Sequence, residues 1–467
     1  MASPFPRELT AFSATALVVS NMIGTVIFTS TGFLAADLGS PLLVIGIWLA
    51  GGLMAMAGCL AYAELGINLP RSGGEYIYLR EAWGPTWGFM SGWVSFFAGF
   101  SAPIAASALA ASVYLGYFIP FLSSTDATGS QRASNTVLDL GLVEVHWGAG
   151  QLVAISLVAL FALVNVFGLR IAARLQNVLT TLKVGVILVF ITLGVFVGKG
   201  NVGHFLQSAE RTSSHTLAAQ FGVSLIVVMF AYSGWNAATY VVEELRDSAT
   251  VLPRVLVSGT LLVLILYLCL NMIYIYAVPL EELKGVEAVG AVTATALFGK
   301  QVGDLFSAVM AMALVSAVSA MVIAGPRVYY AMAIDGCFFP DAGRIHPRWQ
   351  TPARSILYQA LAASMMILVG SIEALFYYVG FALIFFAGLA TAGVLKLRKR
   401  EGWRRTRALN WFYPAIPLTF VLVSAWMLVY TLALRPVEST WGLFTIASGG
   451  IAYRFWLWRG RRRNAEE

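Results

Sequence analysis

Long apolar runs recur along the whole chain, and most are long enough to cross a lipid bilayer as a helix. Because hydrocarbon offers no hydrogen-bond partners, a backbone that crosses it must form helices or a closed barrel. The 467-residue chain is 59% hydrophobic and 11% charged, about half the charged fraction of a soluble domain. We therefore predict an all-α integral membrane protein with twelve transmembrane helices, over approximately residues 12–36, 42–66, 86–118, 149–168, 172–197, 215–245, 252–278, 301–333, 354–371, 374–396, 410–433 and 439–458.

The basic residues are distributed unevenly over the connections between these spans. Of the 30 lysines and arginines, 23 fall on the side of the N-terminus, 6 fall on the opposite side, and Lys183 lies within a span. Basic connections stay in the cytoplasm, so both termini are predicted to be cytoplasmic in a multi-pass protein of the cell inner (plasma) membrane. The net charge of +7 is thus explained by orientation in the lipid bilayer, and we expect no nucleic-acid partner.

Small and polar residues interrupt two of the apolar runs at mid-depth. Gly24-Thr25-Val26 interrupts the first span, and residues 230–236, with the sequence FAYSGWN, interrupt the sixth. Broken helices at matching positions of two halves indicate the binding site of a transporter. The other interpretation is that Gly24 lets a neighbouring helix pack closely. We predict a membrane carrier whose substrate lies between the two breaks.

The spacing of the breaks predicts the domain organisation. They are 208 positions apart (232 minus 24), and each opens a set of five predicted spans. An odd number of helices in each set requires a five-plus-five inverted repeat with discontinuous first and sixth helices. The predicted transport core covers residues 1–400, with repeat 1 over about 12–197 and repeat 2 over about 215–396. Residues 401–467 are predicted to add two C-terminal transmembrane helices and a basic tail.

The main chain at the breaks provides groups that suit a zwitterion. A half-helix that begins near Thr25 would direct free N–H groups and a positive dipole end at a carboxylate. The carbonyls of Phe230, Ala231 and Ser233 would lose their helical partners and could accept hydrogen bonds from an ammonium. Tyr232 and Trp235 are candidate aromatic gates, with ordinary packing as the alternative for each.

Lys183 lies about midway along the fifth span, too deep to reach either surface by extending its side chain. A lysine at that depth costs ~2.5–3.5 kcal/mol, so carbonyls of a broken helix or a hydroxyl lining must offset the cost. We expect its ammonium to occupy the place of a coupling cation, which makes transport sodium-independent. The alternative is a lysine in a wet cavity with no transport role.

Several motifs together resemble the amino acid–polyamine–organocation superfamily, and the L-type amino-acid transporters and their bacterial relatives are the most similar group. The residues that carry the resemblance are Gly24–Phe28, Tyr62–Gly66, Pro70–Tyr76, Phe230–Asn236 and Glu243-Glu244, while Gly325–Ala333 is also similar to cationic amino-acid carriers. The resemblance covers the chain from the first span to about residue 400. It implies the same inverted repeat and transport by alternating access.

The resemblance also implies roles for individual residues. N–H groups near Thr25 and Val26 would hold the substrate carboxylate, and Lys183 matches the family lysine that replaces a sodium ion. The substrate ammonium would be held by the carbonyls of Met22, Phe230, Ala231 and Ser233.

Two features depart from the family pattern. Val26 stands where the family usually has a second glycine, and a β-branched residue disfavours positive φ and fills the pocket near the carboxylate. This predicts a smaller or differently placed substrate, or a weakened carboxylate site and an amine ligand. The outer loop 119–148 has no cysteine, so we expect no disulfide-linked ancillary subunit, in contrast to the animal L-type carriers.

The spans restrict the substrate and the type of activity. Because Glu64, Glu243, Glu244 and Glu373 all lie near span ends, no carboxylate is expected to pair with a cationic substrate at mid-depth, and a neutral amino acid is favoured. Exchange and proton-coupled uptake both remain open, and a cationic amino-acid or polyamine carrier is the alternative. A channel is disfavoured because half-helix ends form a closed site. An enzyme, a metal and a cofactor are not expected, because the spans hold no histidine and no paired carboxylates.

Overall fold

A computed structural model describes residues 7–116, 136–139, 144–286, 289–369 and 372–466. The first half of the chain forms α1 (Ala11–Met22), α2 (Val26–Leu38), α3 (Pro41–Asn68), α4 (Glu75–Trp83), α5 (Pro85–Val94), the π-helix η1 (Ser95–Ser101), α6 (Ala102–Gly116), α7 (Ala149–Val166), α8 (Leu169–Phe196), the 3₁₀-helix η3 (Val202–Leu206) and α9 (Leu217–Ala231). A two-stranded antiparallel hairpin of β1 (Thr136–Asp139) and β2 (Glu144–Trp147) lies between α6 and α7.

In the second half of the chain, every described secondary-structure element is a helix. This half forms α10 (Ala237–Tyr240), the 3₁₀-helix η4 (Val242–Glu244), α11 (Ser248–Ala277), α12 (Leu280–Leu283), α13 (Val289–Phe298), α14 (Lys300–Ile334), the 3₁₀-helix η5 (Pro340–Gly343), α15 (Ala353–Val369), α16 (Ile372–Leu397), α17 (Arg407–Trp411), α18 (Ala415–Leu434) and α19 (Pro436–Glu466).

The structure confirms the prediction of an all-α membrane protein with discontinuous first and sixth helices. Nine segments of the described chain are long and apolar enough to span a membrane, and three apolar helices are shorter. One of the shorter helices is α9, because the sixth span breaks after Ala231. The count of twelve spans and the division at residue 400 stay predictions.

Three local features were not predicted. The third span contains the π-helix η1 between α5 and α6, and π-helical turns are frequent at functional sites. The connection between the seventh and eighth spans carries α13. The outer loop between α6 and α7 contains the β1–β2 hairpin, while its residues 117–135 and 140–143 lie outside the described residues.

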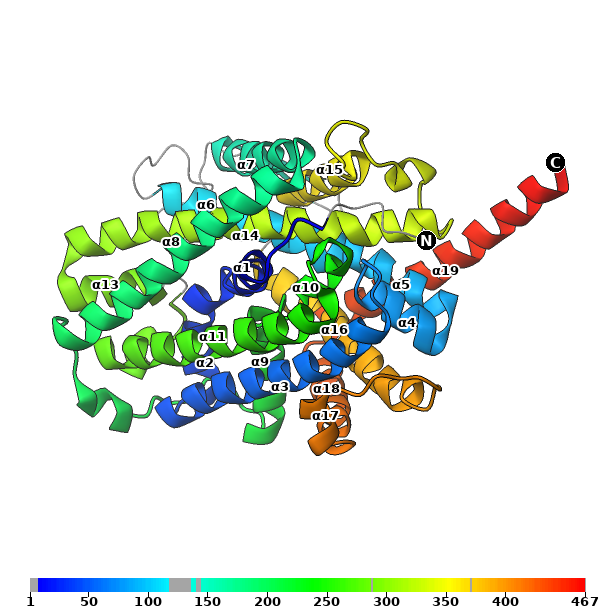
Figure 1. Cartoon of the computed structure of the whole chain (residues 1–467). Helices are drawn as coiled ribbons and strands as arrows, with labels where there is room; N and C mark the ends of the chain where they lie inside the picture. Colours follow the sequence, from blue (N-terminus) through cyan, green and yellow to red (C-terminus); the bar gives the residue numbers. More distant parts are fainter. Residues whose placement is uncertain (1–6, 117–135, 140–143, 287–288, 370–371, 467) are drawn as a thin grey trace.

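The long helices α3, α8, α11 and α14 cross the molecule in roughly the same direction, with α3 packed on α11 and α8 packed on both α11 and α14 (Figure 1). The halves of the first span lie within this arrangement, since α1 contacts α8, α11 and α14, and α2 contacts α9. Both breaks therefore lie inside the bundle, where the surrounding protein satisfies the backbone groups that a broken helix frees.

Contacts at the predicted cytoplasmic end hold the ends of the two broken helices together. Leu9, just before α1, forms a β-bridge with Leu245, and its N–H donates to the carbonyl of Glu244 at 2.9 Å. Glu244 forms an ion pair with Arg327 of α14 at 2.8 Å, and both side chains are buried. Glu64 is also buried and accepts two hydrogen bonds from Arg398, at 2.5 and 2.7 Å. These span-end carboxylates are paired inside the protein.

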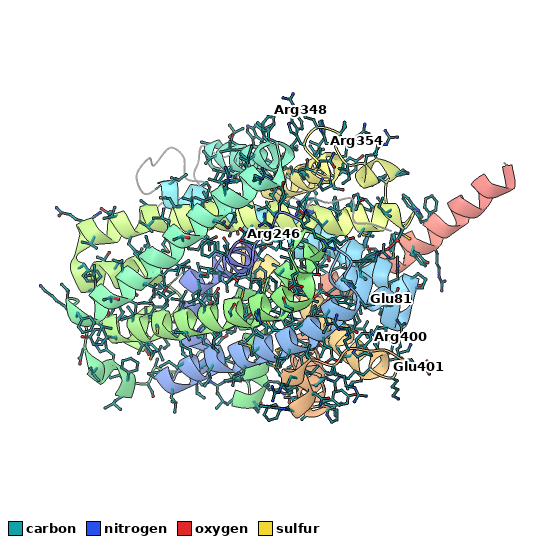
Figure 2. The ribbon with its side chains drawn as sticks, viewed as in Figure 1. Glu81, Arg246, Arg348, Arg354, Arg400 and Glu401 are labelled. Carbon is teal, nitrogen blue, oxygen red and sulfur yellow. The ribbon has the colours of Figure 1, made fainter. Side chains whose placement is uncertain are left out.

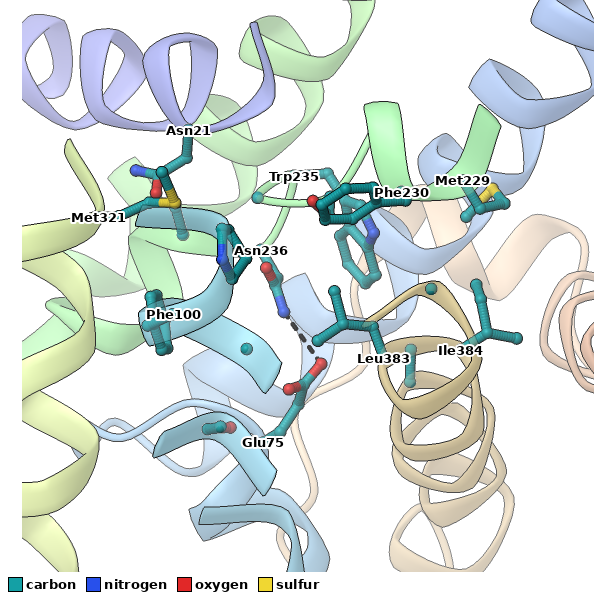
Figure 3. A pocket seen from close by; sticks show the side chains of 18 of the residues that line it. Asn21, Glu75, Phe100, Met229, Phe230, Trp235, Asn236, Met321, Leu383 and Ile384 are labelled. Atoms are coloured by element: carbon teal, nitrogen blue, oxygen red, sulfur yellow. Dashed lines mark hydrogen bonds between the residues drawn. The ribbon is translucent and has the colours of Figure 1, made fainter. Parts of the chain in front are cut away.

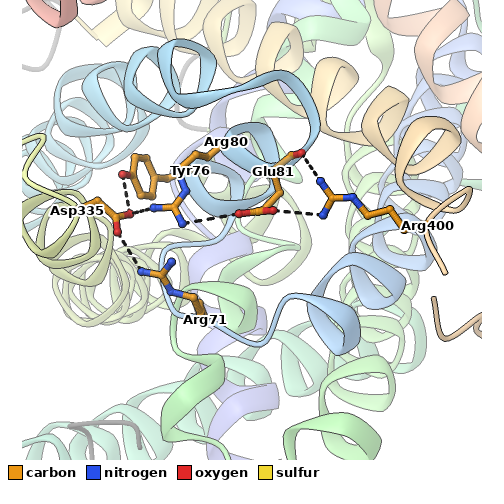
Figure 4. A network of polar contacts seen from close by, with 6 residues as sticks. All are labelled: Arg71, Tyr76, Arg80, Glu81, Asp335 and Arg400. Carbon is orange, nitrogen blue, oxygen red and sulfur yellow. Dashed lines mark hydrogen bonds and ion pairs between the residues drawn. The ribbon is translucent and has the colours of Figure 1, made fainter. Parts of the chain in front are cut away.

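A network of charged residues fixes α4 against neighbouring elements at the same end (Figure 4). Asp335, after α14, accepts from Tyr76 at 2.8 Å, from Arg71 at 3.2 Å and from Arg80. Burial alone would raise the pKa of Asp335, but the hydrogen bonds from Tyr76 and Arg80 hold it below its ordinary value.

On the other side of the network, Glu81 of α4 accepts from Arg400 at 3.2 Å (Figure 2). The network thereby sets the position of α4, whose first residue reaches the interior.

Candidate functional site

The first break is a short non-helical link between α1 and α2. The N–H of Gly24 donates to the Met22 carbonyl at 2.9 Å, and Thr25 is the N-cap residue of α2. The first N–H groups of a helix have no acceptors within it, so those of α2 are available at this point. A Cβ added at Gly24 would meet no atom within 4 Å. Close packing of a neighbouring helix therefore does not explain this glycine, and the space beside it is open.

The second break lies directly against the first span. After α9 ends at Ala231, the chain turns through residues 232–236 before α10 begins. Gly234 has φ +96°, and a Cβ at this position would lie 2.6 Å from the Cβ of Asn21. Glycine is required here both by the positive φ and by the close approach of the two spans.

A cavity, here called the central cavity, opens between the two breaks. Six of the residues that line it are the predicted substrate-binding residues Met22, Thr25, Val26, Phe230, Ala231 and Ser233. The others include Pro103 and Ser107 of α6 and Met321 of α14. The structure thus brings all six predicted residues around one space, at the N-terminus of α2 and the C-terminus of α9. Their role in binding remains a prediction.

Tyr267 of α11 joins the two breaks. Its hydroxyl lies 2.6 Å from the Met22 carbonyl oxygen and 3.0 Å from the Ala231 carbonyl oxygen, and the residue is fully buried. The Phe230 carbonyl accepts from the N–H of Ser233 at 2.9 Å, so three of the four carbonyls predicted to hold a substrate ammonium already have a protein partner. Tyr267 was not predicted as a site residue, because a tyrosine in an apolar span gives no indication of which carbonyls its hydroxyl will reach.

Lys183 of α8 is buried beside the first break, as the sequence predicted. Its ammonium donates to the carbonyl of Ile23 at 2.8 Å, to the hydroxyl of Ser20 at 3.2 Å and, more weakly, to the carbonyl of Ser20 at 3.5 Å. The Ser20 hydroxyl lies 2.6 Å from that of Ser316 on α14. The three donors of the lysine thus face a carbonyl of the broken helix and a hydroxyl, which are the two kinds of group expected to offset its burial. No described carboxylate forms an ion pair with it.

A second space, the inner cavity, adjoins the central cavity and shares Asn21, Phe230, Ser233 and Met321 with it (Figure 3). Its lining includes Glu75, the first residue of α4. This corrects the expectation that no carboxylate could meet a cationic substrate. In the sequence, Glu75 follows a Pro/Gly-rich stretch between two predicted spans, but Gly73 and Gly74 adopt positive φ angles of 121° and 53° and direct α4 into the protein. The two consecutive glycines were the only feature of the sequence that indicated that the chain turns back into the protein here.

The carboxylate of Glu75 is 4% exposed and accepts three neutral hydrogen bonds. The donors are the hydroxyl of Tyr62 at 2.8 Å, the hydroxyl of Tyr240 at 3.1 Å and the amide of Asn236 at 3.0 Å. Figure 3 shows the bond from Asn236. Glu75 lies outside the spanning helices, and burial raises its pKa even though these hydrogen bonds lower it. No described cation pairs with it.

The two candidate gates have different surroundings. Trp235 lines the inner cavity and packs edge-on against Tyr62, with 4.6 Å between ring centroids. Tyr232 is fully buried, donates to the carbonyl of Trp48 at 3.0 Å and packs on Tyr267. It is not among the described residues that line either cavity, so its surroundings are those of a packing residue. No gating role is tested by this structure.

Comparison with known proteins identifies relatives along almost the whole chain. A family model described as amino acid permease matches residues 9–455. The large neutral amino acids transporter small subunit 2 of Oryctolagus cuniculus is 29% identical over 96% of this chain and 80% of the relative. The serine/threonine exchanger SteT of Bacillus subtilis is 27% identical over 91% of each chain. The b(0,+)-type amino acid transporter 1 of Mus musculus is 28% identical over 96% of this chain and 87% of the relative.

Proposed function

The chain belongs to the amino acid permease family, and we propose that it carries neutral L-amino acids across the membrane by sodium-independent alternating access. Membership makes it a multi-pass membrane protein of amino-acid transport. The choice of neutral substrates, the independence from sodium and the coupling mode are the proposal.

The observation that carries the proposal is the central cavity between the two helix breaks. The start of α2 provides unpaired N–H groups and the positive end of a helix dipole, which favour a carboxylate. Across the cavity, the carbonyls at the end of α9 can accept from an ammonium, because a carbonyl oxygen that already has one partner keeps a second lone pair. A free α-amino acid carries a carboxylate and an ammonium on one carbon, so the part that all amino acids share can bind the main chain at the two breaks. The residues that line the cavity then select among the side chains.

Sodium independence follows from the contacts of Lys183. The ammonium already occupies the space beside the Ile23 carbonyl and the Ser20 hydroxyl, oxygen atoms of the kind that bind a hard cation. A sodium ion at this position would meet the positive charge of the lysine. We propose exchange as the coupling mode, in keeping with the name of the relative SteT, and proton-coupled uptake as the alternative.

Glu75 supports a second candidate function, carriage of cationic amino acids. A buried carboxylate without a cationic partner is costly to ionise, and a cationic side chain entering the inner cavity would offset that cost. Because the pKa of Glu75 is raised, the empty site binds a proton at higher pH than an ordinary glutamate. Uptake of a cationic substrate should therefore increase as pH rises through the folded pKa, because only the ionised carboxylate attracts it.

Counterflow in proteoliposomes tests both candidates. Proteoliposomes that contain the purified protein and are loaded with unlabelled L-leucine should accumulate labelled L-leucine equally in sodium and in choline buffers. A panel of neutral, cationic and acidic amino acids and polyamines, applied as competitors, then defines the substrate class. Steep dependence on sodium would overturn the assignment of Lys183.

The Glu75→Gln variant separates the two substrate classes. It keeps the hydrogen-bonding shape and removes the charge, so it should abolish the pH-dependent competition by L-lysine and retain L-leucine flux. Competition by L-lysine that is the same in both proteins would exclude Glu75 as the partner of a cationic side chain.

Membrane orientation and subunit composition are further parts of the proposal. We propose that both termini face the cytoplasm of the cell inner membrane and that transport needs no disulfide-linked subunit. Protease cleavage of terminal tags in inside-out vesicles tests the orientation. Flux from the purified chain alone tests the subunit requirement.

A further inference from the structure

We propose that a third cavity, near the predicted outer end of α2 and α9, is a second binding site for a zwitterionic amino acid, with Asp37 and Arg435 holding its two charged groups. This outer cavity lies among α2, α9, the start of α16 and the link between α18 and α19. The inference rests on the proposed function, because it assumes that free amino acids are the solutes that reach this surface.

The outer cavity lies on a path toward the central cavity. Phe376 lines the outer cavity, Phe230 lines the central cavity, and their ring centroids are 5.5 Å apart. The two rings thus form a partition between the spaces. Asp37 is eleven residues beyond Val26 on α2, which corresponds to about 16 Å along the helix. A ligand in the outer cavity would therefore be separate from one between the breaks.

Asp37 provides a carboxylate with capacity for a further donor. One of its oxygens accepts from the hydroxyl of Ser224 at 2.8 Å, and the side chain of Gln220 is a second hydrogen-bonding neighbour of the carboxylate. The nearby Arg211 donates instead to the main-chain carbonyl of Asp37, at 3.0 Å, and to the carbonyl of His215, at 2.9 Å. Each ionised carboxylate can accept several hydrogen bonds, so an ammonium can be accommodated beside Ser224.

Arg435 provides the opposite charge. Its guanidinium lies over the ring of Tyr377, 4.7 Å from the centroid, and no described residue accepts a hydrogen bond from it. No ion pair within 4.0 Å joins it to Asp37, although both side chains line the same cavity. An arginine fork binds a carboxylate through two parallel hydrogen bonds. The cavity therefore holds a cation and an anion that face one space without contacting each other.

The separation of these charges selects the class of ligand. A free amino acid can place its ammonium at Asp37 and its carboxylate at Arg435, which satisfies both charges at once. The remaining lining is largely apolar and aromatic, with Phe33, Leu34, Val227 and Phe376 available to cover a side chain. A simple cation or anion would satisfy only one of the two groups. The chemistry thus favours a neutral amino acid with an apolar side chain.

Equilibrium binding of labelled L-leucine to the purified full-length protein in nanodiscs tests the proposal. Wild-type protein should show two binding phases, with the weaker one assigned to the outer cavity. Asp37→Asn and Arg435→Gln should each weaken that phase by about tenfold or more, since a lost charge-assisted contact is worth at least one factor of ten. Glu282→Gln, which removes an exposed charge in α12, is the matched control and should leave both phases intact.

The outcomes separate this inference from the proposed function. A single binding phase in wild-type protein that shows L-leucine counterflow would overturn the outer site and leave the proposed function standing. Absence of both binding and counterflow for every amino acid would overturn the proposed function. If both variants change only the rate of flux and keep the two phases, Asp37 and Arg435 form a gate and the proposal is wrong. Arg435→Lys guards against a folding defect, because it retains the charge and should retain the second phase.

Discussion

Replacement of Lys183 by methionine should separate transport from stability. Methionine keeps most of the apolar stem but removes the ammonium, which donates to Ile23 at 2.8 Å and to Ser20 at 3.2 Å. Hydrogen bonds from a charged group contribute about 1.5–3 kcal/mol each, so the two good contacts amount to roughly 3–6 kcal/mol. Burial of the lysine costs ~2.5–3.5 kcal/mol. The difference, about −0.5 to 3.5 kcal/mol, predicts a protein that still folds.

Transport should respond far more strongly than stability. Ile23 is the C-cap residue of α1 and belongs to the break itself. Loss of the ammonium therefore leaves its carbonyl without this donor and loosens the main chain that lines the substrate site. A loss of only about 1.4 kcal/mol of binding free energy lowers affinity about tenfold. We therefore expect Lys183→Met to reduce L-leucine counterflow at least about tenfold in KM or maximal rate.

The assay pairs counterflow in proteoliposomes with the thermal unfolding midpoint of the same preparation. Lys199→Met is a suitable control, because this lysine is exposed just beyond the end of the same helix. Counterflow kinetics of Lys183→Met that equal those of the wild type would refute the role of a cation substitute. A variant that does not fold would refute the energy balance above.

Other changes test the remaining contacts. Val26→Gly should enlarge the central cavity and so raise the affinity for larger substrates or admit them. An unaltered competition profile would show that the Val26 side chain does not limit substrate size. Tyr267→Phe should remove the hydroxyl that lies between the Met22 and Ala231 carbonyls, of which Met22 keeps the N–H of Gly24, and destabilise the protein by about 1–3 kcal/mol, with a changed KM, as measured by denaturant unfolding and counterflow. Arg327→Met should cost about 3–5 kcal/mol by leaving Glu244 buried and unpaired, and adding Glu244→Leu should recover much of this loss; equal stability of the single and double variants would argue against a buried pair.

The breaks were predictable because they disturb a simple pattern. Glycine, threonine, serine and asparagine within apolar runs of spanning length leave few explanations other than an interrupted helix. Lys183 was predictable for a similar reason, since a charge at mid-depth requires partners, and the structure places it beside the break. Both inferences use the cost of polar groups in hydrocarbon, which depends on depth along one span and not on the neighbouring helices.

Glu75, Tyr267 and the pair of Asp37 and Arg435 could not be found in this way. Glu75 follows a Pro/Gly-rich turn and looks like a surface residue until α4 is seen to enter the interior. Tyr267 and the two breaks are far apart along the chain, and only the packing of α11 brings them together. Asp37 and Arg435 are far apart in the sequence, and only the folded chain places both side chains at the outer cavity.

The amino-acid sequence by itself determined the membrane class, the family resemblance, the two broken helices and the buried lysine, because solvation in a bilayer acts on each segment separately. The tertiary structure alone decided which carbonyls are already occupied, which carboxylate reaches a cavity and which opposite charges face each other. Those features depend on distances between segments remote in the chain, and such distances are set by helix packing.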